Sequence, residues 1–230
     1  MRLEALRREV LEANLELIRR NLVIYTFGNA SGISREEGLV AIKPSGVPFD
    51  ELTPESMVLT DLDGRVVEGK LRPSSDLDTH IVLYKAFSGI GGVVHTHSRY
   101  ATSWAQAGRE IPCFGTTHAD YYHGPVPITE PLSDAEIGGE YERNTGHVIV
   151  RRLRGIDAVK SPGVLVRNHG PFAWGATPSK AAQNAVLLEE IAAIAYQTVV
   201  LNAAAGPIPA ALHDRHFLRK HGPSATYGQR

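Results

Sequence analysis

The sequence predicts an α/β fold, formed as one domain over residues 1–230 around a mixed or antiparallel sheet. Three observations predict it. Segments with the period of a strand alternate with segments with the period of a helix along the whole chain. The segment 57–69 (MVLTDLDGRVVEG) is typical of a hairpin closed by Asp63-Gly64, and a hairpin makes its two strands antiparallel. No linker, repeat or low-complexity segment divides the chain.

Each element of the first half follows from a local pattern. Apolar residues at spacings of three and four predict an amphipathic helix over 3–17. The segment 22–34 (LVIYTFGNASGIS) is interpreted as a strand that breaks into a Gly/Asn/Ser turn. The segment 36–52 reads as a strand followed by a Pro-Gly loop. Residues 73–87 begin with capping residue types and continue with helical spacing.

The second half continues the alternation. Residues 90–98 (IGGVVHTHS) predict a strand, and the next ten predict a helix. Ser133 and Glu136 match a capping box at the start of another helix. The remaining predicted elements are a short strand at 111–114, strands at 147–153 and 163–170, a strand from 172 leading into a long helix that starts near Thr177-Pro178, and a short helix in the tail after 205.

Composition and charge exclude several classes of function. The chain is 43% hydrophobic and 21% charged with a formal net charge of −1, so it predicts neither a nucleic-acid partner nor an anionic membrane surface. Its one cysteine, Cys113, cannot form an internal disulfide, which suits a reducing compartment. The N-terminal stretch is too charged for a secretory signal, and Glu189 and Glu190 interrupt the longest apolar segment. We therefore expect a cytoplasmic protein.

Two histidines stand at the end of the strand predicted at 90–98. His95 and His97 are two residues apart, so on a strand they would share a face, with Cα atoms about 7 Å apart. Two imidazoles placed in this way can bind one metal ion. The alternative is a pair of polar residues on a solvated face. The apolar Gly-Val-Val run before them indicates a buried strand and favours the metal.

A divalent metal site needs further ligands, and the sequence offers two candidates. His169 lies at the end of the strand predicted at 163–170, beside a glycine turn. Asp76 lies at the start of the helix predicted over 73–87, where a helix cap is the more ordinary role for an aspartate.

Three short loops suggest a phosphate site. The segments 28–32 (GNASG), 43–46 (KPSG) and 73–76 (PSSD) are rich in Gly, Ser and Asn, which present backbone N–H groups and hydroxyls to an anion. Lys43 adds a positive charge, and the third loop precedes a helix whose N-terminus favours anions. Turns alone also look like this, but three such loops beside a candidate metal site favour a phosphorylated substrate.

Other classes of protein with a His-x-His motif fit less well. A cupin dioxygenase would need a nearby Glu and an all-β pattern, whereas the segment after His97 is helical. An amidohydrolase would place the motif near the start of a barrel larger than this chain. A non-enzymatic interaction module with this predicted α/β fold should lack the candidate metal ligands. Metal storage would not explain the phosphate loops.

Motifs spread over the whole chain identify a resemblance to a known family. The chain resembles the class II aldolase-like sugar-phosphate enzymes in a series of motifs that occur in the same order as in the family. These motifs are GNASG, IKPSGV, PSSD, GGVVHTHSRYAT, GTTHADYYHG, NHGPFAWG and LRKHGPSATYGQ. The resemblance implies a three-layer α/β/α domain with a mainly antiparallel sheet. It also implies a homotetramer whose active sites lie between neighbouring subunits, with a small sugar phosphate as the partner.

The resemblance also implies roles for particular residues. The implied metal ligands are Asp76, His95, His97 and His169. The implied phosphate-binding residues are Gly28, Asn29, Ser45, Gly46, Ser74 and Ser75, with Lys43 nearby. The implied acid/base pair is Asp120 and Tyr227, and His216 lines the site. Without the resemblance, Asp120 would be a turn residue, His216 a surface histidine and Tyr227 part of a disordered C-terminus.

Within the family, the motifs resemble the 4-epimerases that interconvert L-ribulose 5-phosphate and D-xylulose 5-phosphate. The C4 proton of a 2-ketose is not next to the carbonyl, so a 4-epimerase can break the C3–C4 bond, turn the aldehyde and re-form the bond. A metal ion would stabilise the enediolate as a Lewis acid. Zn²⁺ suits three histidines, and Mn²⁺ or Co²⁺ could replace it. The alternative is a sugar-phosphate aldolase releasing dihydroxyacetone phosphate. Aldolases that resemble this chain carry Glu at the position that Asp76 occupies in the PSSD motif.

Overall fold

A single sheet of seven strands runs through the centre of the molecule. The computed structural model describes residues 1–223 and 225–226. The strands follow the order β4-β3-β2-β1-β5-β7-β6, and each neighbouring pair is antiparallel. The strands are β1 (Asn29–Ser34), β2 (Leu39–Ile42), β3 (Val58–Asp61), β4 (Val66–Glu68), β5 (Gly92–His95), β6 (Gly163–Val166) and β7 (Gly170–Gly175). The predicted α/β fold with a mainly antiparallel sheet is confirmed.

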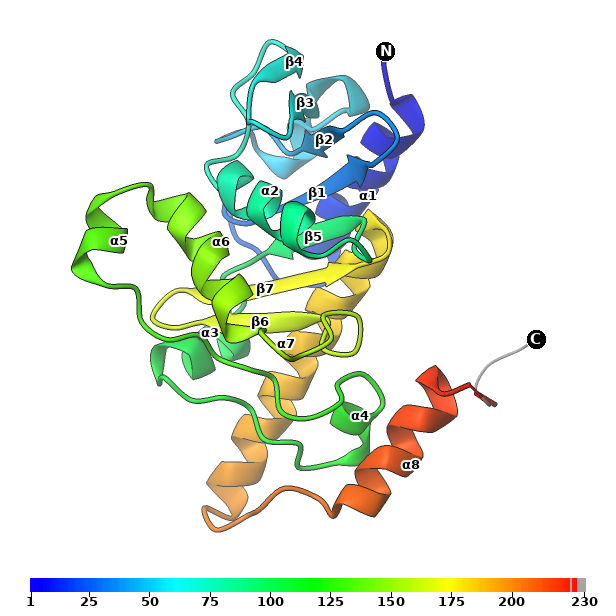
Figure 1. Ribbon diagram of the computed structural model, residues 1–230, viewed down its shortest axis with the longest axis vertical. Coiled ribbons are helices and arrows are strands. Elements are labelled where there is room, and N and C mark those ends of the chain that lie inside the picture. The colour runs from blue at the N-terminus through cyan, green and yellow to red at the C-terminus, as the bar shows by residue number, and fades with distance from the viewer. Residues whose placement is uncertain (224, 227–230) are drawn as a thin grey trace.

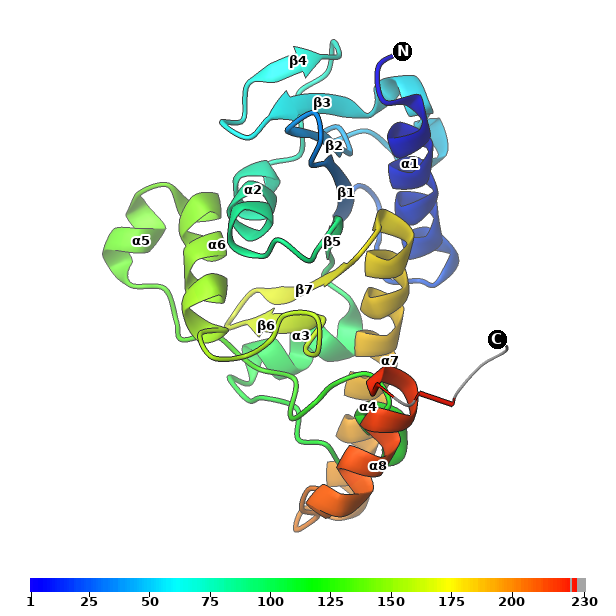
Figure 2. The same cartoon turned by 45° about the vertical axis from the view of Figure 1, so that its right-hand side comes forward.

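Helices cover both faces of this sheet (Figures 1 and 2). The long helices are α1 (Glu4–Arg19), α2 (Leu77–Ala86), α3 (Arg99–Gln106), α6 (Tyr141–Arg152), α7 (Pro178–Leu201) and α8 (Ala210–His221). The short ones are η1 (Phe49–Glu51), η2 (Pro54–Ser56), α4 (Thr116–Ala119) and α5 (Asp134–Gly138). Alternate residues of β5 serve opposite layers: Val94 packs with α1 and α7, and Val93 packs with α2 and α6. The three-layer arrangement follows from this alternation.

The segment predicted as a strand breaking into a turn has the opposite order. Residues 22–28 form the irregular part, and β1 starts at Asn29, inside the segment predicted as a Gly/Asn/Ser loop. Helix packing explains the small residues of β1, because a Cβ on Gly32 would lie 2.6 Å from the Pro178 side chain. The polar side chains of β1 find buried partners, such as the His80 ring, 2.7 Å from the Ser31 hydroxyl.

Two other sequence predictions are wrong. Residues 147–152 lie in α6, with Leu153 as its C-cap, and not in a strand, since Thr145, Val148 and Ile149 are buried with helical spacing. A short apolar run of this kind does not distinguish a strand from a buried helix. The strand predicted at 111–114 is reduced to a single bridge between Ile111 and Val126. The hairpin at Asp63-Gly64 and the capping box of Ser133 with Glu136 are confirmed.

Helix α7 is apolar, but only the side that packs on the sheet is buried. By length and composition alone it could cross a membrane. It packs along β5 and β7, however, with residues such as Leu188 and Ile191 buried. Glu189, one of its two adjacent acids, accepts hydrogen bonds from the backbone N–H groups of Tyr100 and Ala101 at 2.8 and 2.9 Å. This carboxylate satisfies the first turn of α3 and so fixes the segment that follows His97.

Helix α8 lies away from the layers, beside α4 at the end of the molecule beyond β6 (Figures 1 and 2). Its buried apolar anchor is Phe217, which is 3% exposed. The remaining contacts of α8 with the α4 segment are mostly polar, and they involve two of the residues singled out from the sequence, Asp120 and His216.

Candidate active site

The site begins where β5 ends. His95 is the last residue of β5 and lies opposite Asn29 of β1 and Phe172 of β7 in the sheet register. Residues opposite each other in neighbouring strands point to the same face, so all three side chains lie on the side of α2 and α6. The His95 ring stacks on Phe172 with centroids 4.2 Å apart and an angle of 17°. The position of this imidazole is therefore fixed by the sheet itself.

Three histidines meet at this point. His97 follows the strand end, and His169 lies in the turn between β6 and β7, after Asn168 with its left-handed φ of 62°. One nitrogen from each of His95, His97 and His169 lies within 4.8 Å of the others. The ring centres of His97 and His169, which both lie outside the strands, are 5.0 Å apart. His97 therefore joins the group through the chain turn after β5 and not through strand period alone.

Hydrogen bonds direct particular ring nitrogens toward one another. His95 donates from Nδ1 to the Pro171 carbonyl at 3.0 Å, which leaves its Nε2 as an acceptor. His169 Nδ1 lies 3.3 Å from the Tyr141 hydroxyl. His97 Nε2 is 3.0 Å from His95 Nε2. Three convergent imidazole nitrogens that are oriented in this way are a suitable donor set for a divalent transition metal.

Two histidines of the site, His97 and His169, have a lowered pKa and so favour their neutral form. Burial, together with the nearby His95 and His97, lowers the pKa of His169 to about 4. Burial and the neighbouring His95 also lower the pKa of His97. A neutral imidazole is the form that binds a metal ion, so these two side chains are ready to act as ligands at neutral pH.

Asp76 occupies the cap position of α2 without capping it. No hydrogen bond from the first turn of α2 reaches its carboxylate. Instead, Oδ2 accepts a hydrogen bond of 2.6 Å from the Asn29 amide. Burial would raise the pKa of Asp76, but His95, His80 and Asn29 lower it more, and the net shift is downward. The carboxylate is thus an anion facing the histidines, although it lies outside the group whose ligand atoms are within 4.8 Å of one another.

Two of the predicted phosphate loops are paired with each other. The Ser45 N–H donates to the Arg72 carbonyl at 2.9 Å, and the Ser74 N–H donates to the Lys43 carbonyl at 3.0 Å. Pro44 and Pro73 form an antiparallel β-bridge. These bonds use the N–H groups of Ser45 and Ser74 and leave those of Gly46 and Ser75 outside the pairing. The first turn of α2 follows directly, so its positive end faces the same place.

Lys43 is buried behind these loops. It is 1% exposed, its ammonium lies 4.7 Å from the centre of the Phe49 ring, and it donates to the Pro44 carbonyl at 3.2 Å. Burial lowers its pKa to about 8. A buried cation that has no acid partner among the described residues is stabilised when an anion arrives beside it.

All of these groups line one open cleft with a volume of about 580 Å³. Its lining includes every predicted metal and phosphate residue: Gly28, Asn29, Lys43, Ser45, Gly46, Ser74, Ser75, Asp76, His95, His97 and His169. Sequence reasoning missed Thr26, Phe27, Tyr141 and Glu142, which also line it. Phe27 and Thr26 directly precede the GNASG motif, which was a signal for them. Tyr141 and Glu142 begin a helix far along the chain, and no local pattern marked them.

The start of β1 is shaped to fit the cleft. Gly28 has a φ of 79°, and a Cβ there would lie 2.9 Å from the His95 carbonyl, so glycine is required. Asn29 uses its amide N–H on Asp76, while its Oδ1 is buried without a partner among the described residues. An unpaired buried oxygen acceptor suits a hydroxyl donor better than a phosphate oxygen.

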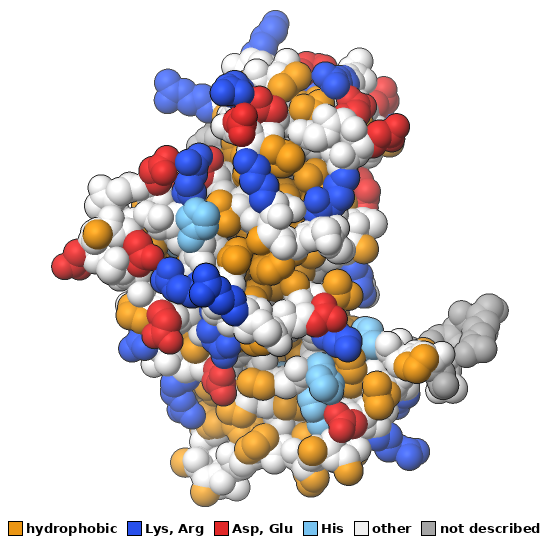
Figure 3. Space-filling view, viewed as in Figure 1, with side chains coloured by type: hydrophobic (Ala, Val, Ile, Leu, Met, Phe, Trp, Pro, Cys, Tyr) orange, Lys and Arg blue, Asp and Glu red, His pale blue; other side chains and the backbone are white. Residues whose placement is uncertain are grey.

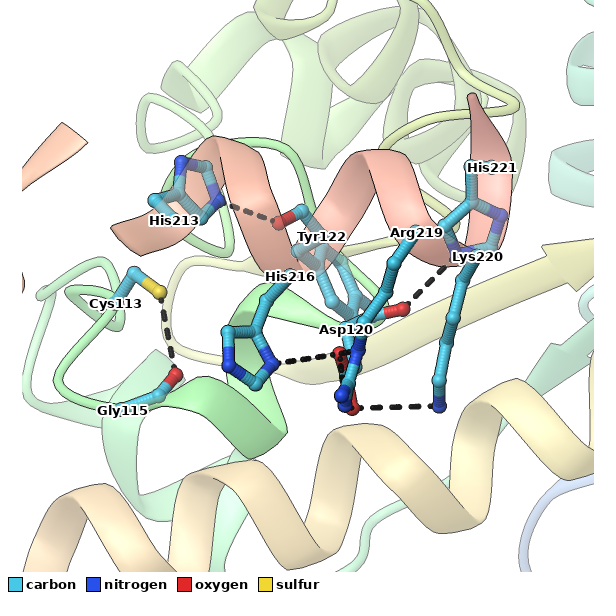
Figure 4. A network of polar contacts seen from close by, with 9 residues as sticks. All are labelled: Cys113, Gly115, Asp120, Tyr122, His213, His216, Arg219, Lys220 and His221. Atoms are coloured by element: carbon cyan, nitrogen blue, oxygen red, sulfur yellow. Dashed lines mark hydrogen bonds and ion pairs between the residues drawn. The ribbon is translucent and has the colours of Figure 1, made fainter. Parts of the chain in front are cut away.

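Asp120 and His216 lie outside this cleft. Asp120 follows α4, and its carboxylate binds Arg219 at 2.8 Å, His216 at 3.1 Å and Lys220 at 3.4 Å (Figure 4). Burial would raise the pKa of Asp120, but Arg219, His216 and Lys220 together lower it. Within one chain, Asp120 and His216 therefore lie in a polar cluster separate from the cleft. Tyr227 lies outside the described residues.

Comparison with known proteins assigns the chain to a family. The model of the class II aldolase and adducin N-terminal domain matches residues 8–196. The L-ribulose-5-phosphate 4-epimerase UlaF of Salmonella paratyphi B is 51% identical over 99% of this chain and 100% of its own length. The protein of that name from Salmonella typhi is 50% identical over the same shares.

Solved structures show the same architecture. An L-fuculose 1-phosphate aldolase superposes with a TM-score of 0.78 at 25% identity, covering 92% of this chain and 94% of the aldolase. YgbL from Klebsiella pneumoniae, described as a putative aldolase/epimerase/decarboxylase, has a TM-score of 0.74 at 24% identity, covering 94% and 99%. Since the family model spans the sheet and the histidine cleft, and since full-length relatives share half of its residues, this chain belongs to the class II aldolase and adducin N-terminal domain family.

Proposed function

We propose that this protein is an L-ribulose-5-phosphate 4-epimerase, which interconverts L-ribulose 5-phosphate and D-xylulose 5-phosphate. The observation that carries the proposal is one cleft in which three histidines face two anion-binding loops. A relative that shares 51% of its residues over the full length bears that activity in its name. The reaction breaks the C3–C4 bond, turns the two-carbon aldehyde and re-forms the bond with C4 inverted, so no atom is gained or lost.

His95, His97 and His169 would hold a divalent cation, with Asp76 as the fourth protein ligand. Zn²⁺ suits three imidazoles and a carboxylate, and Mn²⁺ or Co²⁺ could replace it. Bound there, the ion supplies the Lewis-acid charge that stabilises negative charge on substrate oxygens. Pro171 and Tyr141 orient His95 and His169 through their second ring nitrogens.

The rest of the cleft would bind the two ends of the sugar phosphate. Gly46 and Ser75 offer backbone N–H groups to the phosphate, beside Ser45 and Ser74, and the start of α2 adds its dipole. Lys43 supplies the charge behind them. Asn29, whose remaining polar atom is an acceptor, would bind a sugar hydroxyl and at the same time hold Asp76. The phosphate is on C5, so these groups would keep the two-carbon aldehyde phosphate bound in the cleft while its aldehyde group turns.

The acid/base groups would come from a neighbouring subunit. Asp120 and His216 do not line the cleft of their own chain, so the site is complete only if a second copy brings them, together with Tyr227. Large exposed apolar side chains, including Tyr25 and Phe27 near the cleft and Val200 and Leu201 at the end of α7, support contacts between copies. We expect a homotetramer of single-domain subunits, located in the cytoplasm, with neither a nucleic acid nor a membrane as a partner.

Subunit mixing tests this arrangement. His97→Asn and Asp120→Asn should each lower activity by at least about a hundred-fold in a homomeric enzyme. If the two residues act across a subunit boundary, then unfolding and refolding the two variants together should produce hybrids in which some sites carry both intact groups. Restored activity supports shared sites, whereas an inactive mixture that still assembles contradicts them.

The reaction itself is tested by product analysis. The metal-loaded enzyme is given L-ribulose 5-phosphate and D-xylulose 5-phosphate is measured, and in a parallel sample it is given L-fuculose 1-phosphate and free dihydroxyacetone phosphate is measured. The epimerase forms the first without the second. The alternative is an aldolase, which the structural likeness to an L-fuculose 1-phosphate aldolase favours; it would release dihydroxyacetone phosphate from its own 1-phosphate substrate. Absence of D-xylulose 5-phosphate from the pentulose phosphate sample contradicts the epimerase.

A further inference from the structure

A second group of metal-ligating side chains lies at the contact between α8 and the segment that follows α4. His123 comes from that segment, and His213 and Asp214 come from the first turns of α8. One ligand atom from each lies within 4.8 Å of the other two. Figure 3 shows histidine side chains beside an acidic one over α4 and α8. None of the three residues lines the cleft described above.

The local geometry already brings the group together. His123 Nε2 lies 3.1 Å from Asp214 Oδ1, and the two imidazole rings stack at 5.1 Å with an angle of 19°. His213 Nε2 is 2.9 Å from the Tyr122 carbonyl. A hydrogen bond from one ring nitrogen to a backbone carbonyl is the usual way in which proteins orient a histidine ligand. The ligand atoms of the three groups already lie within 4.8 Å of one another, a separation from which they can close on one ion.

The group is also accessible from solvent. The side chains of His123 and Asp214 are 47% and 52% exposed. A metal ion can therefore enter without unfolding the helix, and water molecules can complete its coordination. Two imidazoles with one carboxylate favour Zn²⁺, Cu²⁺ or Ni²⁺ over Mg²⁺ and Ca²⁺, which prefer oxygen ligands.

We propose that His123, His213 and Asp214 form a second binding site for a divalent transition metal, Zn²⁺ in the first instance, which fastens α8 to the α4 segment. The helix needs such a fastening, because Phe217 is its fully buried apolar residue and most of its other contacts are polar. The same helix carries His216 and Arg219, which hold Asp120. An ion at its first turns would therefore stabilise the cluster around Asp120 as well.

Metal stoichiometry tests the proposal without any assay of activity. Chelator-treated full-length protein is titrated with zinc chloride by calorimetry, and bound zinc is measured after gel filtration. We expect two zinc ions per chain in the parent protein, one in His97→Asn, one in His123→Ala and none in the double variant. Asp214→Asn, which changes an exposed side chain, should weaken the second site in the same way. His147→Ala, which alters an exposed histidine of α6 outside both groups, is the matched control.

Hydrogen exchange tests the structural consequence. In the His97→Asn background, zinc should slow amide exchange in residues 210–221, and His123→Ala should remove this effect. Equal zinc binding by His123→Ala and the parent overturns the site. Zinc binding without added protection of α8 overturns the fastening. Because the measurements are made with the cleft disabled, failure of this site and failure of the proposed epimerase activity are distinguishable.

Discussion

The cleft and the α8 cluster hold their charged and titratable groups by different means. In the cleft, His95 is fixed by strand register, a stacked Phe172 and a backbone carbonyl. Around Asp120, one carboxylate is held by long side chains of a helix that lies outside the sheet layers. The first arrangement is rigid because a sheet cannot shift one residue without turning every side chain to the other face. The second can adjust more easily, which would suit the proposed role of these groups in the site of another chain.

The largest effect is expected in the cleft. His97→Asn removes one of three convergent nitrogens, so bound metal should be lost and turnover should fall by at least about a thousand-fold, the order of several kcal/mol that a catalytic metal supplies. Metal analysis and the product assay on the same sample check both. His147→Ala is the control for a general effect of removing a histidine. If His97→Asn still bound a full equivalent of metal in the cleft, in addition to any metal at the α8 site, the ligand assignment would be disproved.

A large effect without metal loss is expected at the α8 cluster. Asp120→Asn keeps the shape of the side chain but removes its charge, so turnover should fall by about a hundred- to ten-thousand-fold, as for a lost general acid or base. The cleft should keep its metal, because Asp120 does not line it. If Asp120→Asn lost the metal as well as turnover, the cleft and the α8 cluster would not be separate, in contrast to their arrangement within one chain.

Lys43 gives a pH test of the phosphate end. Its pKa of about 8 means that the ammonium is present below pH 8 and is lost as the pH rises through that value. KM for the sugar phosphate should therefore rise above pH 8, although bound phosphate itself raises the pKa of Lys43 and softens the change. Lys43→Met should raise KM about ten- to hundred-fold at pH 7, the value of a hydrogen bond to a charged group. An unchanged KM in Lys43→Met would show that this lysine does not contribute to binding of the phosphate.

The smallest effect is expected from a supporting contact. Tyr141→Phe removes the hydroxyl that lies 3.3 Å from His169 Nδ1. Metal affinity should fall by about ten-fold, the lower end for outer groups that orient a metal-bound histidine. Competition with a metal-binding dye measures it, and the fold should be unchanged. An equal affinity would show that His169 is oriented by packing alone.

The sequence and the structure agree where a local pattern is sufficient. The hairpin at Asp63-Gly64 and the capping box at Ser133 each depend on residues a few positions apart, and both are present. They disagree where burial decides. The segment 147–153 has an apolar run that fits either period, and it is helical because Thr145, Val148 and Ile149 are buried together on one side of α6. The segment GNASG has the composition of a turn, but it becomes β1 because helices on one face leave room only for small residues.

The sequence by itself determined the chemistry that is available to this protein: paired histidines at a strand end, glycine- and serine-rich loops, and a lysine beside one of them. These are local features, since residue type and spacing act over a few positions. Only the tertiary structure decided that His169 meets His95 and His97, that Asp76 turns from its helix cap to Asn29, and that Asp120 binds α8 instead of entering the cleft. The reason is that sheet register and helix docking join residues far apart in the chain, and no local pattern encodes those contacts.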